Sequence, residues 1–407
     1  MNRKLLEKTG IFSAALLLCL CVSLLCPAAF AEAPVDLMNT EGEDYIFDFC
    51  TLPDGGLVFA GFTEARAESG TESAQDNTRG RLICLNPDRT VRWVCEDDSP
   101  SVYGPVVLTK DGRIAADSSS GCVKFFTPDG EPAGPDLMLP NRNDTLYSVT
   151  SLGVLRAERH GGRTAEETEL IDWDGNVLFR IHEPESMCCT GYNPIAEEDG
   201  LVLFGQAAGD PAEAPAKIMK VDLQGNTIWE TELPFILDKR DSAGVGPVIR
   251  TGDGTYLAIV RNLVYRPKDD IWSCSFNLAS LSSNGLIQWI HAPTCPFEEI
   301  ADYNGKYVVY GRDFVPGENR EFMNYLWLDI NGRDLGTTQL PIPEAGLSPY
   351  NSENASAAGE KLIPTGDGLW QLICFWEPDP LDDDEFPARI AGDSLLIRVP
   401  ELGTEGQ

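Results

Sequence analysis

Several side chains that could bind a polar ligand are concentrated in three segments of the second half of this chain. They combine guanidinium groups, carboxylates and indole rings: Arg266, Asp269, Asp270, Trp272, Arg312, Asp313 and Trp376. Indole rings offer a large flat surface for stacking, and charged groups orient a ligand through strong hydrogen bonds. The residues predict a polar and aromatic binding rim, although solvated loop charge is the simpler interpretation of the same pattern. They identify no catalytic residue.

A run of carboxylates near the C-terminus is a candidate for a metal site. It contains Asp382, Asp383 and Asp384, and oxygen ligands at this density can hold Ca²⁺. The run lacks the alternate-residue spacing and the glycine turn of a calcium loop, so a solvated charge run fits it better. We therefore expect no cofactor, with Ca²⁺ as the one alternative.

The motifs of familiar enzyme classes are missing. The three histidines are far apart in sequence, and there is no H-E-x-x-H, G-x-S-x-G or phosphate loop. Cys188 and Cys189 are adjacent and could close a strained disulfide, but two neighbouring thiols are the default interpretation. A pair of catalytic carboxylates for glycoside cleavage remains an alternative, because the distance between two carboxylates depends on the three-dimensional structure.

The N-terminus has the features of an export signal. Arg3, Lys4 and Lys8 precede an apolar run over residues 11–26, and Ala29-Phe30-Ala31 is a small-x-small cleavage site. We expect residues 1–31 to be a signal peptide and residues 32–407 to be the mature protein. It should be secreted or located in the cell envelope, without a membrane span and as a monomer.

The net charge excludes some classes of partner, and the cysteine count predicts free thiols. A formal net charge of −33 repels nucleic acid and anionic membranes. Of the 12 cysteines, three lie in the leader, and the odd number that remains leaves at least one unpaired. Several lie within apolar stretches, such as those around Cys84 and Cys374, so we expect most to be buried thiols.

Two short phrases recur along the mature chain and predict the fold. The first is a turn residue, a glycine and an apolar strand, repeated about every fifty residues at Gly56, Gly112, Gly153, Gly200, Gly254, Gly305 and Gly368. The second is an outer turn followed by an aromatic residue, at Trp93, Phe179, Trp229 and Trp289. Short strands at this period are typical of a β-propeller. We predict an all-β, single-domain, seven-bladed propeller with four-stranded antiparallel blades, whose aromatic residues pack between adjacent sheets.

The repeat also predicts how the ring closes and where its loops lie. The seventh unit lacks one strand, and Pro34–Met38 has no place in the first unit. We therefore expect Pro34–Met38 to form the outer strand of the seventh blade beside Ser394–Val399, which removes the open edges. The long connections 64–79, 207–216, 264–271, 312–321 and 377–393 should join second to third strands on one face, where the binding rim would lie.

The second phrase resembles a known repeat. Val221-Asp222-Leu223-Gln224-Gly225-Asn226-Thr227-Ile228-Trp229 is similar to the repeat of bacterial secreted propellers of the quinoprotein-dehydrogenase-like and YVTN-like kind. The resemblance covers nearly the whole mature chain and implies a fold rather than an activity. We interpret the protein as a non-enzymatic binding module for a glycan, a peptide or another envelope protein. The alternative is an exported glycosidase or lyase with carboxylates at the mouth of the channel.

Overall fold

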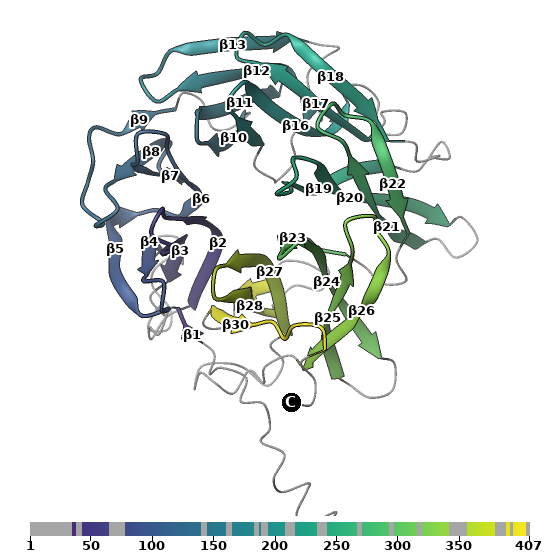
Figure 1. Cartoon of the computed structure of the whole chain (residues 1–407). Helices are drawn as coiled ribbons and strands as arrows, with labels where there is room; N and C mark the ends of the chain where they lie inside the picture. Colours follow the sequence, from purple (N-terminus) through teal and green to yellow (C-terminus); the bar gives the residue numbers. More distant parts are fainter. Residues whose placement is uncertain are drawn as a thin grey trace, which may run out of the picture.

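Seven antiparallel sheets surround one common axis, as the blades of a propeller do (Figure 1). The computed structural model describes residues 35–37, 43–64, 78–139, 145–159, 165–182, 187–188, 194–207, 216–233, 242–266, 271–292, 297–315, 320–341, 356–378, 388–390 and 394–403. All strand pairs within these ranges are antiparallel, and each sheet has four strand positions from the axis outward. The predicted fold is confirmed.

The first four blades follow the chain in order. Their strands are β2 (Glu43–Thr51), β3 (Leu57–Glu64), β4 (Thr78–Leu85) and β5 (Val91–Pro100); β6 (Tyr103–Leu108), β7 (Ile114–Ser118), β8 (Cys122–Phe126) and β9 (Leu137–Met138); β10 (Thr145–Thr150), β11 (Gly153–Arg159), β12 (Ala165–Asp172) and β13 (Val177–His182); and β14 (Met187–Cys188) with β15 (Ile195–Glu197), β16 (Gly200–Ala207), β17 (Ala216–Asp222) and β18 (Thr227–Glu232). In the fourth blade, β14 and β15 share the innermost position, because both pair with β16.

The last three blades complete the ring. Their strands are β19 (Ser242–Arg250), β20 (Tyr256–Arg266), β21 (Ile271–Leu281) and β22 (Ile287–His291); β23 (Glu299–Tyr303), β24 (Lys306–Val315), β25 (Arg320–Leu328) and β26 (Asp334–Pro341); and β27 (Ser356–Thr365), β28 (Gly368–Pro378), β29 (Ala388–Ile390), β30 (Leu395–Arg398) and β1 (Val35–Asp36). Both β29 and β30 pair with β28, at different parts of that strand.

The N-terminal strand closes the ring as predicted. Val35 pairs with Leu396 and Asp36 with Leu395, so β1 is the outer strand of the seventh blade. The Leu37 backbone N–H donates to the Ser394 carbonyl at 3.1 Å, and the Leu37 side chain is 4% exposed among core residues of the first and seventh blades. The two ends of the chain therefore hold the first and last blades together.

The repeated glycines lie at the turns from the first to the second strand of each blade. Gly112 and Gly254 adopt φ values of 84° and 85°, which L-residues rarely do. Because the strands alternate in direction, these turns and the third-to-fourth turns lie on one face of the disc, here called the turn face. The second strands end, and the third strands begin, on the opposite face, here called the loop face. This arrangement confirms that the repeated glycines lie on one face of the disc.

The recurrent aromatic residues pack between blades, as predicted. A Cβ built on the outer-turn glycine of each following blade would lie 2.7 Å from the Trp93 ring at Gly130, 2.5 Å from Trp229 at Gly285 and 2.8 Å from Trp289 at Gly332. The indole of one blade therefore covers a glycine of the next, at a distance no other residue permits. These rings therefore contribute to the packing between adjacent blades.

The contact between Trp229 and Gly285 supports a prediction about stability. Gly285→Ala adds a methyl group 2.5 Å from the indole at a φ of +82°, so we expect it to lower the free energy of unfolding by about 2 kcal/mol or more. Gly112→Ala is the matched control, because it has nearly the same φ and no heavy atom within 4 Å. Denaturant unfolding of both variants measures the difference. Equal losses would show that the indole contact contributes nothing.

Arg89 explains the one outer turn that departs from the glycine rule. It adopts φ 67° in the first blade, next to the seam with the seventh blade. The outer strand there is β1, which brings no aromatic ring. The Arg89 guanidinium instead lies 5.3 Å over the Trp370 ring and pairs with Asp367, and its side chain is only 5% exposed. An arginine thus occupies the space that an indole fills at the other seams described above.

Three of the cysteines that the structure describes behave as core thiols. Cys84, Cys122 and Cys374 are buried free thiols, and burial raises the pKa of Cys84 to about 11 and of Cys374 to about 12. These two thiols stay protonated and unreactive at neutral pH. Among the described residues, no helix is long and apolar enough to cross a membrane.

Candidate functional site

A cavity of about 350 Å³ lies where the inner strands of the first, fifth, sixth and seventh blades face one another. Five charged side chains line it: Asp48 of β2, Arg250 of β19, Glu299 and Asp302 of β23, and Lys361 of β27. Apolar residues complete the wall, among them Ile249, Ile300, Leu362 and Pro364. Convergent charged groups in a partly apolar cavity are typical of small-molecule sites.

β-Bulges help to aim these side chains at the axis. The register shifts between Ile46 and Asp48 in β2, and again between Gly359 and Lys361 in β27. A third shift, between Val245 and Val248 in β19, contains Pro247, which cannot donate a ladder hydrogen bond. Bulges bend a strand and redirect its side chains, and they are frequent beside active sites. Asp48, Lys361 and Val248, the first paired residues after these shifts, all line the cavity.

Glu299 and Lys361 form an ion pair across the cavity wall. The Lys361 Nζ lies 3.3 Å from the Glu299 Oε1, and Glu299 is 9% exposed. Burial raises the pKa of the Glu299 carboxyl to about 7, Lys361 opposes this shift, and the nearby charges of Glu360 and Asp48 add to it. A carboxyl with this pKa is both a proton donor and a proton acceptor at neutral pH.

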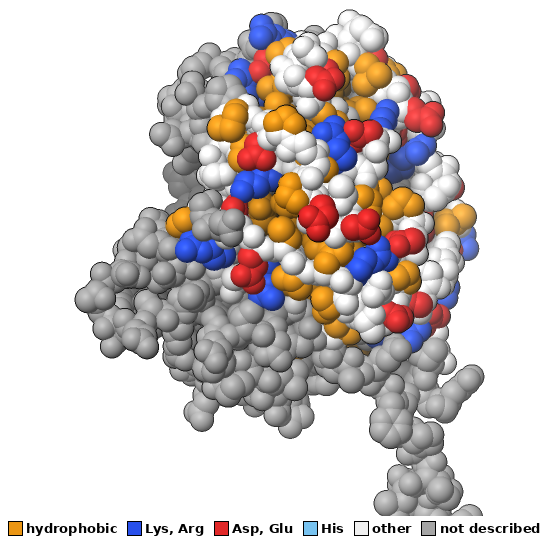
Figure 2. Space-filling view, turned by 90° about the vertical axis from the view of Figure 1, so that its left-hand side faces the viewer, with side chains coloured by type: hydrophobic (Ala, Val, Ile, Leu, Met, Phe, Trp, Pro, Cys, Tyr) orange, Lys and Arg blue, Asp and Glu red, His pale blue; other side chains and the backbone are white. Residues whose placement is uncertain are grey.

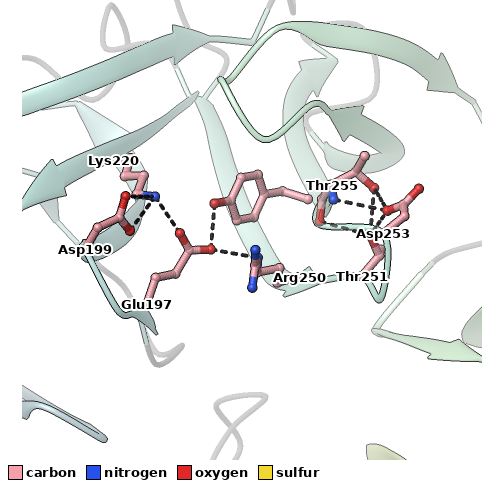
Figure 3. Close-up of polar contacts among 8 residues, drawn as sticks. Glu197, Asp199, Lys220, Arg250, Thr251, Asp253 and Thr255 are labelled. Atoms are coloured by element: carbon pink, nitrogen blue, oxygen red, sulfur yellow. Dashed lines mark hydrogen bonds and ion pairs between the residues drawn. The ribbon is translucent and has the colours of Figure 1, made fainter.

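A buried network holds Arg250 at the edge of the same cavity. Figure 3 shows Lys220 and Arg250 reaching Glu197 from opposite sides. Arg250 Nε lies 2.9 Å from Glu197 Oε1, and Lys220 Nζ donates to Glu197 Oε2 at 2.6 Å. Tyr256 donates to Glu197 at 2.7 Å, and Lys220 also donates to Asp199 at 2.9 Å. The Glu197 side chain is 7% exposed, so Arg250 is fixed by a group that is itself immobile.

Backbone hydrogen bonds position two of the carboxylates. The Gly252 N–H donates to Asp302 Oδ2 at 2.6 Å, and the Val106 N–H donates to Asp48 Oδ2 at 3.2 Å. Each donor belongs to a neighbouring blade, so the carboxylates also join adjacent sheets. Both groups are therefore held in place before any ligand arrives.

The residues predicted from sequence lie elsewhere. Arg266 ends β20, Trp272 pairs with Tyr265 near the start of β21, and Trp376 lies toward the end of β28. Arg312 and Asp313 belong to β24. These five are therefore on extended strand ends at the loop face, because the hairpin arms continue further than the loop composition suggests. The cavity instead lies nearer the turn face, beside the ends of β19 and β23.

The remaining predicted residues lie outside the described residues. They are Asp269 and Asp270 of the rim, and Asp382, Asp383 and Asp384 of the acidic run. Cys188 lies on β14, while Cys189 is also outside the described ranges. Among the described residues, no group of three or more side chains is arranged to hold a metal ion. The rim and the calcium site remain predictions.

The sequence does carry a weak signal for the cavity. Arg250 and Asp302 lie only a few residues before the repeated glycines Gly254 and Gly305, each at the end of the first strand of its unit. The first strand of each unit lies nearest the axis, so a charged residue there faces the channel. Comparing that position across units would have selected Asp302 and Arg250.

The outer rim offers a less specific surface. Exposed apolar side chains lie on outer strands, including Val91 and Val94 of β5, Met138 of β9, and Val177 and Leu178 of β13. Figure 2 shows the side of the ring that carries β5 and β9, where hydrophobic side chains are interspersed with acidic and basic ones. Interspersed charges of both signs are typical of an ordinary soluble surface.

Comparison with known proteins confirms the fold and leaves the activity open. No protein-family model and no curated protein matches the sequence. Raptor of Chaetomium thermophilum aligns with 91% of this chain and 29% of its own, at 10% identity and a TM-score of 0.50. A virginiamycin B lyase from Staphylococcus aureus aligns with 90% of this chain and 98% of its own, at 13% identity and a TM-score of 0.49. The WD40 β-propeller domain of Doa1 aligns with 91% of this chain and 98% of its own, at 10% identity and a TM-score of 0.45.

Proposed function

We propose that this protein is a binding module that takes a small polar ligand, or the end of a peptide or glycan chain, into its central cavity. The observation that carries the proposal is the convergence of five charged side chains from four blades on one cavity of about 350 Å³. A secreted or cell-envelope location, expected from the leader, would place this cavity in contact with extracellular peptides, glycans or other envelope proteins.

Preorganisation supports binding at this site. Asp48 and Asp302 are held by backbone donors, and Arg250 by a buried carboxylate. A ligand would therefore meet groups that lose little further freedom on binding, which is where affinity is most often gained. The cavity is also lined by apolar side chains, so its charges act in a medium less polar than bulk water.

One observation favours a second candidate, an exported lyase or glycosidase. Glu299 has a pKa of about 7 because it is buried, and it faces the same cavity as the carboxylates of Asp48 and Asp302. A general acid or base works best when its pKa lies near the operating pH. In such an enzyme Glu299 would exchange a proton with the substrate, and turnover would be lost in Glu299→Gln without loss of binding.

The binding proposal predicts which variants should weaken binding. We expect a panel of glycans and short peptides, screened against residues 32–407, to yield a ligand whose affinity falls at least tenfold in Asp302→Asn. A charge-assisted hydrogen bond in a partly apolar site contributes enough for this loss. The exposed Asp174→Asn is the matched control and should bind within twofold of the parent.

A rim variant distinguishes the cavity from the loop face. If Trp376→Ala abolishes binding while Asp302→Asn does not, the ligand binds at the rim and the cavity proposal is wrong. Conversion of any panel member into product by the parent, and not by Glu299→Gln, would establish the enzymatic candidate instead.

A further inference from the structure

The cavity contains a fixed cation and a fixed anion beside one turn, and this juxtaposition indicates a class of ligand. Resting on the proposed binding function, we propose that the cavity recognises a small zwitterion, a free amino acid or a short peptide. Its carboxylate pairs with Arg250 and its ammonium group with Asp302.

Arg250 provides the positive end of the site. Its side chain is 52% exposed, and among the described residues its only ion pair runs from Nε to Glu197. The terminal nitrogens of the guanidinium group remain available, and their planar arrangement matches the two oxygens of a carboxylate. Glu197 is itself held in place, because Lys220 and Tyr256 also donate hydrogen bonds to it.

Asp302 provides the negative end. It accepts one backbone hydrogen bond, from Gly252 to Oδ2, and within the described part of the chain it pairs with no cation. Oδ1 is thus left for a ligand donor. An ammonium group carries three donors and suits a carboxylate in this state.

Both ends lie against the turn between β19 and β20. Asp302 contacts this turn at Gly252, and a Cβ built on Gly254 would lie 3.5 Å from Arg250 Nη2. Asp253 receives hydrogen bonds from Thr251 and Thr255, which fixes the turn (Figure 3). Although both residues line one cavity, no ion pair within 4 Å joins Arg250 to Asp302. A small ligand that carries both charges can bridge them.

The charges around the cavity disfavour ligands that carry one sign alone. Glu299 is already matched by Lys361, whereas Arg250 shares the single carboxylate of Glu197 with Lys220. A purely anionic ligand would meet Asp48, Asp302 and a protein of net charge −33. A purely cationic ligand would leave the Arg250 nitrogens unused. The apolar wall formed by Ile300, Leu362 and Pro364 suits an aliphatic side chain.

Calorimetry on residues 32–407 with four probes tests this inference. The probes are L-leucine and L-alanyl-L-leucine, which carry both charges, and N-acetyl-L-leucine and L-leucinamide, which carry one each. We expect at least one zwitterion to bind at least tenfold more tightly than both single-charge probes. Equal binding of L-leucinamide or of N-acetyl-L-leucine would overturn the proposal.

Two variants give a signature that a folding defect cannot imitate. Arg250→Gln should remove the preference for the zwitterion over L-leucinamide and keep the preference over N-acetyl-L-leucine. Asp302→Asn should do the reverse, and the exposed Arg333→Gln should change neither preference. If no probe binds, the zwitterion proposal is wrong. If a glycan then binds in the panel described above and loses affinity in Asp302→Asn, the binding function of the cavity stands without it.

Discussion

A mature chain shortened to begin at Asp44 is expected to unfold several degrees below the parent and to associate in solution. The truncation removes β1, whose residues pair with β30, and Leu37, which is 4% exposed in the core shared by the first and seventh blades. Loss of one fully buried leucine side chain alone typically lowers the free energy of unfolding by about 2–5 kcal/mol. The seventh blade would also present the unpaired edge of β30, which is a template for association.

Point variants separate the contribution of the side chain from that of the strand. Leu37→Ala keeps β1 and should lower the free energy of unfolding by about 2–3 kcal/mol, which is less than the truncation should. Met138→Ala removes a side chain that is 68% exposed and should change stability by less than about 0.5 kcal/mol. Thermal unfolding and sedimentation measure both effects. A truncated protein that melts and remains monomeric like the parent would show that β1 is only a tail.

Ring closure could be predicted because it follows from counting units. Seven glycine phrases and one missing strand leave a single place for the N-terminal segment, and the structure confirms that place. The Trp–Gly packing between blades was also predictable, since the two residue types recur at a fixed spacing. Arg89 was visible as an exception to the rule. Its partners, Trp370 and Asp367, lie in the last blade and could be assigned only once the seam was known.

The cavity could not be predicted in the same way. Its charged residues belong to four blades and are separated by up to about three hundred residues of sequence. Three of the four strands contain a bulge, and a bulge reverses the alternation on which any prediction of side-chain direction depends. Long polar segments are easy to recognise in the sequence, and they therefore pointed to Arg266 and Trp376 rather than to Asp302. Composition identifies solvated segments well, but convergence on an axis depends on register.

The stability of the protein is expected to depend on pH through Glu299. Its pKa is about 7 in the folded protein, where burial disfavours the charged form, against an ordinary value near 4.5 when the chain is unfolded. Between these pH values the unfolded chain binds fewer protons than the folded one, so the free energy of unfolding falls as pH rises. A shift of this size corresponds to about 3 kcal/mol, fully present below pH 4.5 and lost by pH 8.

Comparison with Glu299→Gln isolates this contribution, because other carboxyls titrate in both proteins. We expect the difference in free energy of unfolding, parent minus variant, to fall by about 3 kcal/mol between pH 4.5 and pH 8. Lys361→Met supplies a second test. Removing the ammonium group 3.3 Å away takes away the attraction that lowers the Glu299 pKa, so the decline should extend to higher pH. Urea unfolding across the pH range gives both curves. A difference that stays flat from pH 4.5 to 8 would mean that Glu299 titrates as an ordinary exposed carboxyl, and the cavity would then lose its proton donor at neutral pH.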